Sequence, residues 1–460
     1  MSANVHEPVK ITPRAKFLLI VGLFSFISAA QLYAVQLSTA LPKIVDAIGG
    51  MEYLALVFTA IMMGSAIVSP IAGKLSDLAG RRRVLVVGAL VLFASEILGL
   101  FVQNMFQLIA LSLVQGIGGG FSITVSLIVI ADVCTKEERA KYIGYYGSLM
   151  AALMIIGPLL GGIIVDNLNW HFIFVTLMVF CLTGFLLMFK FMPEIPKSPN
   201  AKIDYAGSLL MTVFIVLVVA VSVLGGKTYP WSSSTILIMI AGAILSLILF
   251  IVVENRVSNP IISMSIFTNF TFVLCFVACF LVIMVGVAIS YYFPVYAQKV
   301  KGLTPTMSGM FISGKGIVAF FISAFNGWLI SRLRDYRWNA LVTILLLIVS
   351  VYGFYLMDVN TSLTFIIAVV VIWGLSPYNN IFHIGAQMSL PNTMIVYAMS
   401  AMQLAVSLGA TLGNVLWGVL LRNPDLAMGI KNIFLTSIVL SVLVFVCVLA
   451  LFFGKRNAQG

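Results

Sequence analysis

Long apolar runs separated by short polar segments make up most of the chain. A helix needs about 20 predominantly apolar residues to cross the hydrocarbon core of a bilayer. By that criterion the sequence predicts fourteen membrane-spanning helices, at 16–38, 53–73, 83–103, 106–131, 141–165, 172–193, 206–226, 234–253, 270–293, 308–330, 338–357, 361–384, 395–421 and 430–453. The runs are continuous rather than alternating, which excludes a transmembrane β-barrel. The first run is too long for the apolar region of a signal peptide, so we expect it to remain as a helix.

Composition supports the same class. Of the 460 residues, 61% are hydrophobic and 9% are charged, whereas a soluble domain has about 45–50% apolar and about 25% charged residues. This composition excludes a soluble multidomain enzyme, and it excludes an intrinsically disordered protein, which needs low hydrophobicity and high charge. The sequence therefore predicts an all-α polytopic membrane protein.

The net charge of +11 comes from basic residues scattered through short loops, so we expect no nucleic-acid partner. If the N-terminus is cytoplasmic, nineteen of the 26 Lys and Arg residues fall on the cytoplasmic side, six fall outside and one lies within a span. This asymmetry obeys the positive-inside rule and predicts that both termini are cytoplasmic. We expect the membrane to be the plasma membrane. The five cysteines are odd in number and four lie in apolar runs, which favours neither a disulfide framework nor a metal site.

An internal repeat suggests how the helices are grouped. Segments 73–83 and 327–337 each begin with Gly, carry Leu at the third position and end in basic residues. They lie 254 residues apart, a spacing of about eight helices at this span density. We expect two six-helix bundles, at 1–193 and 270–460, with a linker and an inserted helix pair at 194–269. Transporters built from repeated halves bind substrate near the membrane midplane, where the repeats meet.

Three motifs carry a family resemblance. Segment 73–83 resembles the loop motif between helices two and three of the major facilitator superfamily. The Gln-Gly-Ile-Gly-Gly-Gly run at 115–120 resembles that superfamily's helix-four motif, and Gly-Pro-Leu-Leu-Gly-Gly at 157–162 resembles its helix-five antiporter motif. From about residue 16 to 453 the chain resembles the fourteen-helix drug:proton antiporters, which implies an MFS-type fold and transport by alternating access.

The motif residues have direct physical readings. Gly73 and Gly80 permit close backbone approach and a sharp helix exit. Asp77 can lie near a helix N-terminus or pair with Arg81, and the resemblance implies that this pair gates the transporter; the alternative is a solvated charged loop. Four residues flatten one face of helix five: Gly157, Pro158, Gly161 and Gly162. A flat face suits a helix that packs tightly and rocks against its neighbour during transport, and the alternative is ordinary small-residue packing.

Two positions depart from the family pattern. The helix-one motif usually carries Asp nine residues before the proline of Leu41-Pro42, and this chain has Tyr33 there. The helix-four motif usually carries Arg three residues before Gln-Gly, and this chain has Ser112. The two charges are absent together, as expected if one unpaired charge inside the membrane would be costly. The usual site of proton coupling is therefore absent.

Two charged residues lie well inside predicted spans, Glu96 and Lys315. An ionisable residue in a membrane span is a functional candidate. Glu96 could carry a proton, because a carboxyl away from water is stable in its neutral form; the alternative is a neutral Glu hydrogen-bonded to neighbouring helices. Lys315 lies between Gly314 and Gly316 and would favour an anionic or aromatic substrate; the alternative is a Lys that extends to the outer surface.

Polar and aromatic residues concentrate on three spans that the resemblance places around the transport cavity. Polar groups inside a membrane need partners, which a wet cavity supplies. The candidate substrate-binding residues on these spans are Gln31, Tyr33, Gln36, Tyr291, Tyr292, Tyr378, Asn379 and Asn380, and Lys315 on a fourth span is added to them. His383 is a second candidate for proton coupling, because imidazole protonates near neutral pH; a hydrogen-bonded helix-end His is the alternative.

No catalytic motif was found. The Gly-Gly-Lys-Thr run at 225–228 lacks the first glycine of a phosphate-binding loop. We therefore expect a transporter and not an enzyme, without cofactor or metal, monomeric in the lipid bilayer, that exports small amphipathic organic compounds or drugs by proton antiport. The main alternative is a facilitator or symporter for a specific organic anion. A membrane receptor or scaffold and an ion channel are further, less favoured classes.

Overall fold

The computed structural model describes residues 11–195, 205–225, 229–257, 264–333, 335–391, 394–421 and 425–453. Within these ranges the apolar runs fold as helices. Their bounds are α1 Pro13–Ile48, α2 Leu54–Ala79, α3 Arg81–Gly99, α4 Met105–Val133, α5 Lys136–Asn167, α6 Phe172–Phe191, α7 Tyr205–Leu224, α8 Ser234–Glu254, α9 Phe270–Val295, α10 Pro305–Leu333, α11 Arg337–Leu356, α12 Leu363–Gly374, α13 Tyr378–Met388, α14 Ile395–Leu420 and α15 Leu426–Phe453. Short helical turns cover Met51–Tyr53, Met264–Thr268 and Tyr296–Val300.

Eleven helical stretches of the described chain are long and apolar enough to cross a membrane, and two shorter apolar helices cover Ala206–Val221 and Leu363–Gly374. The predicted all-α polytopic architecture is confirmed, because each apolar run lies in helix and no strand occurs in the described ranges. The number of fourteen crossings stays a prediction.

One predicted span is wrong as a continuous helix. Segment 361–384 is divided between α12, which ends at Gly374, and α13, which begins at Tyr378. Pro377 explains the break, because it has no N–H to donate and disfavours helical backbone at the preceding residue. The hydroxyl of Ser376 donates to the Trp373 carbonyl at 2.8 Å and closes the end of α12.

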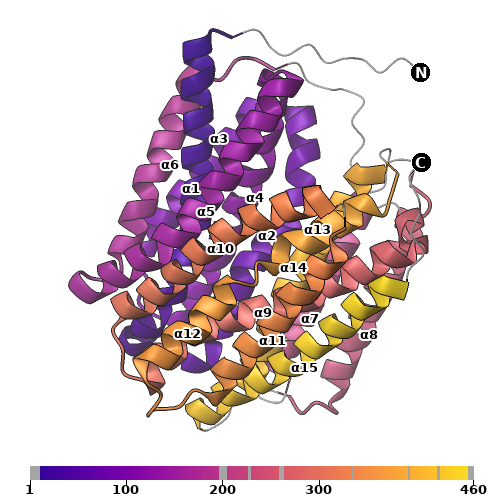
Figure 1. The fold of residues 1–460 in the computed structure, drawn as a ribbon. Coiled ribbons are helices and arrows are strands. Elements are labelled where there is room, and N and C mark those ends of the chain that lie inside the picture. Colours follow the sequence, from indigo (N-terminus) through magenta and orange to yellow (C-terminus); the bar gives the residue numbers. More distant parts are fainter. Residues whose placement is uncertain are drawn as a thin grey trace. The chain divides into compact units, whose positions relative to one another are not determined.

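The chain divides into two compact units. The first comprises Met1–Gly49 and Ala60–Ser208, and the second comprises Gly50–Thr59 and Leu209–Gly460. In the first unit α1 packs against α4, α5 and α6, and α3 packs against α4 and α6 (Figure 1). In the second unit α9 packs against α13, α14 and α15, and α11 packs against α12 and α15. Each unit therefore has its own buried helix faces.

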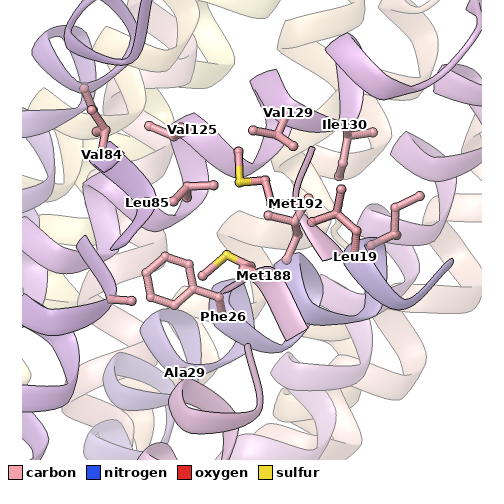
Figure 2. Close-up of a cluster of buried hydrophobic side chains, with 14 of the residues drawn as sticks. Leu19, Phe26, Ala29, Val84, Leu85, Val125, Val129, Ile130, Met188 and Met192 are labelled. Atoms are coloured by element: carbon pink, nitrogen blue, oxygen red, sulfur yellow. The ribbon is translucent and has the colours of Figure 1, made fainter. Parts of the chain in front are cut away.

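The interior of the first unit is close-packed. Figure 2 shows one cluster that contains Phe26 of α1, Leu85 of α3, Val129 of α4 and Met188 of α6, all almost completely buried. Lipid tails are as apolar as these side chains, so shape complementarity and dispersion, rather than escape from water, hold the helices together. This packing fixes the face that α1 presents to α4 and α6.

Helices α1 and α5 approach each other closely at the helix-five motif. A Cβ on Gly161 would lie 2.8 Å from Thr39 Oγ1 and closer still to the Gln36 carbonyl oxygen, so only glycine fits there. The Thr39 hydroxyl donates to the Pro158 carbonyl at 2.8 Å. This bond links α1 to α5 beside the proline, where the missing N–H of Pro158 removes one bond of the helix itself.

Candidate functional site

The turn between α2 and α3 in the first unit is built around one guanidinium group. Gly80 has φ of 101°, a backbone conformation that favours glycine. It lets α3 begin directly after α2, and Arg81 then forms an ion pair with Asp77. Arg81 Nη1 also donates to Ser76 Oγ at 2.7 Å, and Nε donates to Asp132 Oδ2 at 2.9 Å. The expected Asp77–Arg81 pair therefore forms.

Asp132 belongs to the same turn and was not predicted from the sequence. It forms an ion pair that connects α4 to the Arg81 guanidinium. Its only sequence signal was an acidic residue at the end of an apolar run. A Cβ on Gly73 would make ordinary contacts, at 3.5 Å from Ile128 Cδ1. The close backbone approach expected at Gly73 is thus not found, because α4 offers a flexible side chain tip there rather than backbone.

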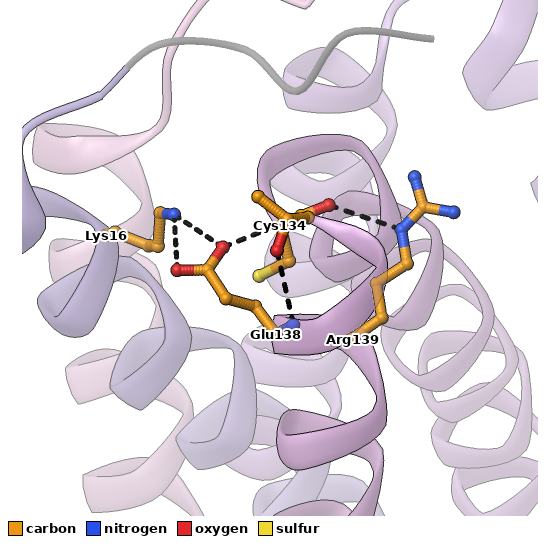
Figure 3. A network of polar contacts seen from close by, with 5 residues as sticks. Lys16, Cys134, Glu138 and Arg139 are labelled. Carbon is orange, nitrogen blue, oxygen red and sulfur yellow. Dashed lines mark hydrogen bonds and ion pairs between the residues drawn. The ribbon is translucent and has the colours of Figure 1, made fainter. Parts of the chain in front are cut away.

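A second ion pair lies near the start of α5. Figure 3 shows Lys16 of α1 with Nζ 2.8 and 3.0 Å from the two carboxylate oxygens of Glu138. Glu138 also accepts from the Thr135 backbone N–H at 3.0 Å, and Thr135 Oγ1 accepts from the Glu138 N–H, which completes a capping box. The hydrogen bond from Lys16 holds the pKa of the Glu138 carboxyl below its ordinary value. The signal missed in the sequence is the Thr-x-x-Glu pattern.

The two positions that depart from the family pattern face each other. The Tyr33 phenol of α1 and the Ser112 hydroxyl of α4 are 2.8 Å apart, and both side chains are fully buried. The Tyr33 ring also lies near Phe174 of α6, with centroids 5.9 Å apart. A neutral hydrogen bond therefore occupies the place where the family pattern has a charged pair.

The two glutamines of α1 bond within the first unit. Gln36 is completely buried and exchanges hydrogen bonds with Thr176 of α6, at 3.2 and 3.3 Å. Gln31 Nε2 lies 3.5 Å from the Met150 sulfur of α5. Gln36 thus links α1 to α6 in this conformation, and Gln31 has only a weak acceptor.

Glu96 is the buried carboxyl of the first unit. Its side chain is 0% exposed, and neither carboxyl oxygen has a hydrogen-bond partner of acceptable geometry among the described residues. The Cys181 thiol of α6 interacts with it, and that thiol itself lies 3.6 Å from the Ala89 carbonyl. The alternative of a well hydrogen-bonded structural Glu is therefore not observed.

Helix α4 carries a polar stripe that the sequence reading did not single out. Gln115, Ser122 and Ser126 are buried, and within the described chain their side-chain polar atoms have no hydrogen-bond partner. Spacings of seven and four residues place them on one helix face. This spacing could have revealed the polar stripe from the sequence. Such orphaned groups are unusual in a packed interior and mark positions where a polar partner could bind.

In the second unit, Lys315 of α10 stacks on the ring of Trp373 at the end of α12, with Nζ 4.5 Å from the ring centroid. Tyr378, the first residue of α13, interacts with the same indole. The structure thus brings together two of the predicted binding residues, Lys315 and Tyr378, around an aromatic residue that the prediction did not include.

The other candidates of the second unit are dispersed. Tyr291 stacks on Phe58 at 3.7 Å between centroids, with a 5° angle between the rings. The Tyr292 hydroxyl is buried without a partner in the described part of the chain. His383 Nε2 lies 4.0 Å from the Cys279 sulfur. Asn379 and Asn380 lie on α13, but their side chains are outside the described residues, as is most of the 225–228 segment.

An apolar groove accompanies the predicted inserted helices. It has a volume of about 420 Å³ and is lined by α7, α8, α14 and the segment before α8, through Phe214, Val218, Val221, Trp231, Ile240, Ala243, Ile244, Leu247, Val415, Leu416 and Val419. A lining of this kind offers dispersion contacts and no hydrogen bonds.

Helices of membrane-spanning length, a charged turn that joins three of them and polar groups buried inside each unit are features of a helical membrane transporter. A sequence model of the Major Facilitator Superfamily matches residues 18–395. The chain belongs to this superfamily of transporters.

Named relatives narrow the comparison. Multidrug transporter protein MdtP of Bacillus subtilis is 33% identical over 317 residues, covering 69% of this chain and 58% of the relative. Multidrug resistance protein 3 of the same organism is 29% identical over 326 residues, covering 71% and 64%. The chain thus matches about six-tenths of the length of these relatives. A crystal structure of the peptide transporter POT with sulfate shares the fold, with a TM-score of 0.69, 16% identity and 98% of each chain covered.

Proposed function

We propose that this protein exports small amphipathic organic compounds across the plasma membrane by alternating access, driven by proton antiport. Two relatives that match about 70% of the chain are named as a multidrug transporter and a multidrug resistance protein. In the proposal the six-helix halves 1–193 and 270–460 are the moving bodies, both termini are cytoplasmic, the protein acts as a monomer, and it catalyses no reaction.

Glu96 is the proposed proton carrier. The burial of its carboxyl group is the observation on which the coupling proposal rests. Glu96 is a fully buried carboxyl without a good hydrogen bond in the described structure, and Tyr33 and Ser112 form a neutral pair where the family resemblance suggests charge. An anion without a partner in the membrane is costly, whereas the neutral acid is tolerated. Glu96 would therefore release and take up its proton only when a conformational change gives the carboxylate a partner or water.

The alternating-access step is assigned to the α2–α3 turn. Arg81 holds Asp77, Ser76 and Asp132 from two further helices. Charge-assisted bonds with directional geometry stabilise one arrangement of the helix ends and must be exchanged in another. Gly157, Pro158, Gly161 and Gly162 supply the thin helix face on which α1 and α5 can slide.

The test uses the full chain in proteoliposomes with an imposed pH gradient. Wild type is expected to move an amphipathic dye against its gradient when protons flow the other way. Glu96→Gln, which mimics the neutral carboxyl, should abolish this pH-driven accumulation and still permit dye exchange without a gradient. Glu52→Gln, at an exposed carboxyl, is the matched control and should behave as wild type.

Two results would contradict the proposal. If dye movement in wild type does not depend on the pH gradient, the protein is not a proton antiporter. If Glu96→Gln keeps full coupling to the pH gradient, Glu96 is not the proton carrier. If Glu96→Gln fails to insert, Glu96→Asp, which keeps an ionisable group, gives the second measurement: its coupling should survive with an altered pH dependence of transport.

The alternative is a facilitator or symporter for a specific organic anion. Lys315, which stacks on Trp373 and forms no ion pair within the described chain, favours it. In that case anion flux should follow the anion's own gradient or the proton gradient inward, and neutral dyes should not move.

A further inference from the structure

Lys315 lies against the break between α12 and α13. A Cβ on Gly374, the last residue of α12, would lie 3.0 Å from the Lys315 carbonyl oxygen and 2.7 Å from Val318 Cβ. The backbone of α10 therefore packs directly on the end of α12. The Lys315 side chain extends to the face of Trp373, and the residue is partly exposed.

The ammonium group has an incomplete set of partners. Lys315 takes part in none of the ion pairs Lys16–Glu138, Arg81–Asp77 and Arg81–Asp132 of the described residues. The Trp373 ring satisfies one side of the cation, and a cation–π contact contributes on the order of 1–2 kcal/mol when it is partly desolvated. A lysine in a membrane span without a carboxylate lacks the partner that such residues usually have.

A second buried donor lies at the same place. Trp373 is 1% exposed, and its Nε1–H has no hydrogen-bond partner of acceptable geometry in the described structure. The phenol of Tyr378 interacts with this indole, which places the polar edge of Trp373 beside the first residue of α13. A buried indole N–H normally finds an acceptor.

The N-terminus of α13 supplies further donors. Pro377 is its N-cap and makes no side-chain capping bond, and the Tyr378 N–H is already used by the Ser376 carbonyl at 2.8 Å. The next backbone N–H groups of an eleven-residue helix have no intrahelical acceptor. Together with the helix dipole they favour negative charge.

We propose that Lys315, Trp373 and the first turn of α13 form a carboxylate-binding subsite, which selects amphipathic organic anions among the transported compounds. The ammonium group, the indole N–H and the unpaired backbone N–H groups are donors, so the ligand must bring acceptors, and the positive charge favours an anionic head. This inference rests on the proposed function only in taking the ligand to be a transport substrate.

The test measures equilibrium binding to the full chain in lipid nanodiscs, without a gradient, by isothermal titration. The probes are benzoate, 2-naphthoate and dodecanoate, each beside its neutral amide of matched shape. Wild type should bind at least one carboxylate on the order of tenfold more tightly than its amide, because charge-assisted hydrogen bonds are stronger than neutral ones. Lys315→Gln should abolish that preference and leave amide binding unchanged.

Three variants separate charge from packing. Lys315→Arg should keep the preference, because a guanidinium retains the charge and stacks on indole. Trp373→Phe keeps a ring under the ammonium and removes the N–H, so it should weaken carboxylate binding alone. Lys301→Gln is the matched control, because Lys301 is another partly exposed lysine of the same unit and its Nζ donates to the Val359 carbonyl. It should leave both affinities unchanged.

The outcomes are distinct. Equal affinity of wild type for carboxylates and amides, no binding of any carboxylate, or an equal loss for both probe types in Lys315→Gln overturns the subsite. The proton-coupled export proposal fails separately, through dye flux that ignores the pH gradient while the carboxylate preference persists. A variant that does not fold is replaced by Lys315→Arg and Trp373→Phe, whose expected results differ from each other.

Discussion

At the residue scale, the positions where the chain departs from its family are the most informative. Tyr33 and Ser112 lie 79 positions apart in the sequence and form a 2.8 Å hydrogen bond inside the first unit. The substitution of a charged pair by a neutral pair keeps the contact between α1 and α4 and removes the desolvation of two ions. Glu96 then remains as a buried carboxyl without such a partner.

This arrangement gives a prediction for charge restoration. Tyr33→Asp places a single carboxyl in a fully buried site, which should destabilise the protein by about 3–5 kcal/mol if it ionises. Adding Ser112→Arg should recover most of that loss, because the two groups face each other. Tyr33→Phe, which removes the hydrogen bond alone, should cost about 1 kcal/mol.

Thermal unfolding of the four proteins in one detergent measures this series. The expected order of melting temperature is wild type, Tyr33→Phe, the double variant and then Tyr33→Asp. A double variant no more stable than Tyr33→Asp would show that the two side chains do not couple.

At the element scale, small residues and helix breaks decide which helices can approach. Gly161 lets α5 reach the backbone of α1, and Pro377 divides what is a continuous apolar run into α12 and α13. Both effects arise from backbone chemistry: a missing Cβ in one and a missing N–H in the other. The first joins two helices, and the second exposes helix ends within the apolar region.

The packing of α5 on α1 predicts opposite effects for two substitutions in one helix. Gly161→Ala should destabilise the first unit by about 1–3 kcal/mol, because the new methyl group meets backbone that cannot yield. Gly147→Ala has no atom within 4 Å of the added Cβ and should be neutral or stabilising by about 0.5–1 kcal/mol through helix propensity.

Melting temperatures and transport rates of the pair test this packing. Gly161→Ala should lose transport together with stability, and Gly147→Ala should lose neither. Equal effects of the two substitutions would contradict a role for close approach at Gly161.

At the scale of the whole molecule, each unit has its own core and its own polar groups. The first contains the Arg81 turn, the Lys16–Glu138 ion pair and Glu96, and the second contains the Lys315–Trp373 stack. The 73–83 motif, on which the family resemblance is strongest, contains Arg81, whose side chain links α2, α3 and α4. A substitution of Arg81 should therefore affect the change between conformations more than the affinity for the ligand.

Arg81→Ala therefore has a specific expected result. Substrate flux should fall several-fold, because the helix ends lose their charge-assisted bonds, whereas equilibrium binding in detergent should change by less than about threefold. Arg82→Ala is the control from the same turn: Arg82 is bonded to the Phe189 carbonyl and stacked on its ring, and its removal should leave flux near wild type. A parallel loss of binding and flux in Arg81→Ala would count against a switching role.

The sequence by itself determined the class of the protein. Apolar runs of membrane length are local patterns, so the helices and the all-α membrane architecture followed from the sequence. The sequence left two arrangements open for Asp77, near a helix N-terminus or paired with Arg81, and the structure shows the pair. Only the tertiary structure decided which distant side chains meet: Tyr33 with Ser112, Arg81 with Asp132, Lys16 with Glu138, and Lys315 with Trp373. These contacts depend on the rotation and crossing of packed helices, which are set by many small side-chain fits between segments far apart in the chain rather than by any local pattern.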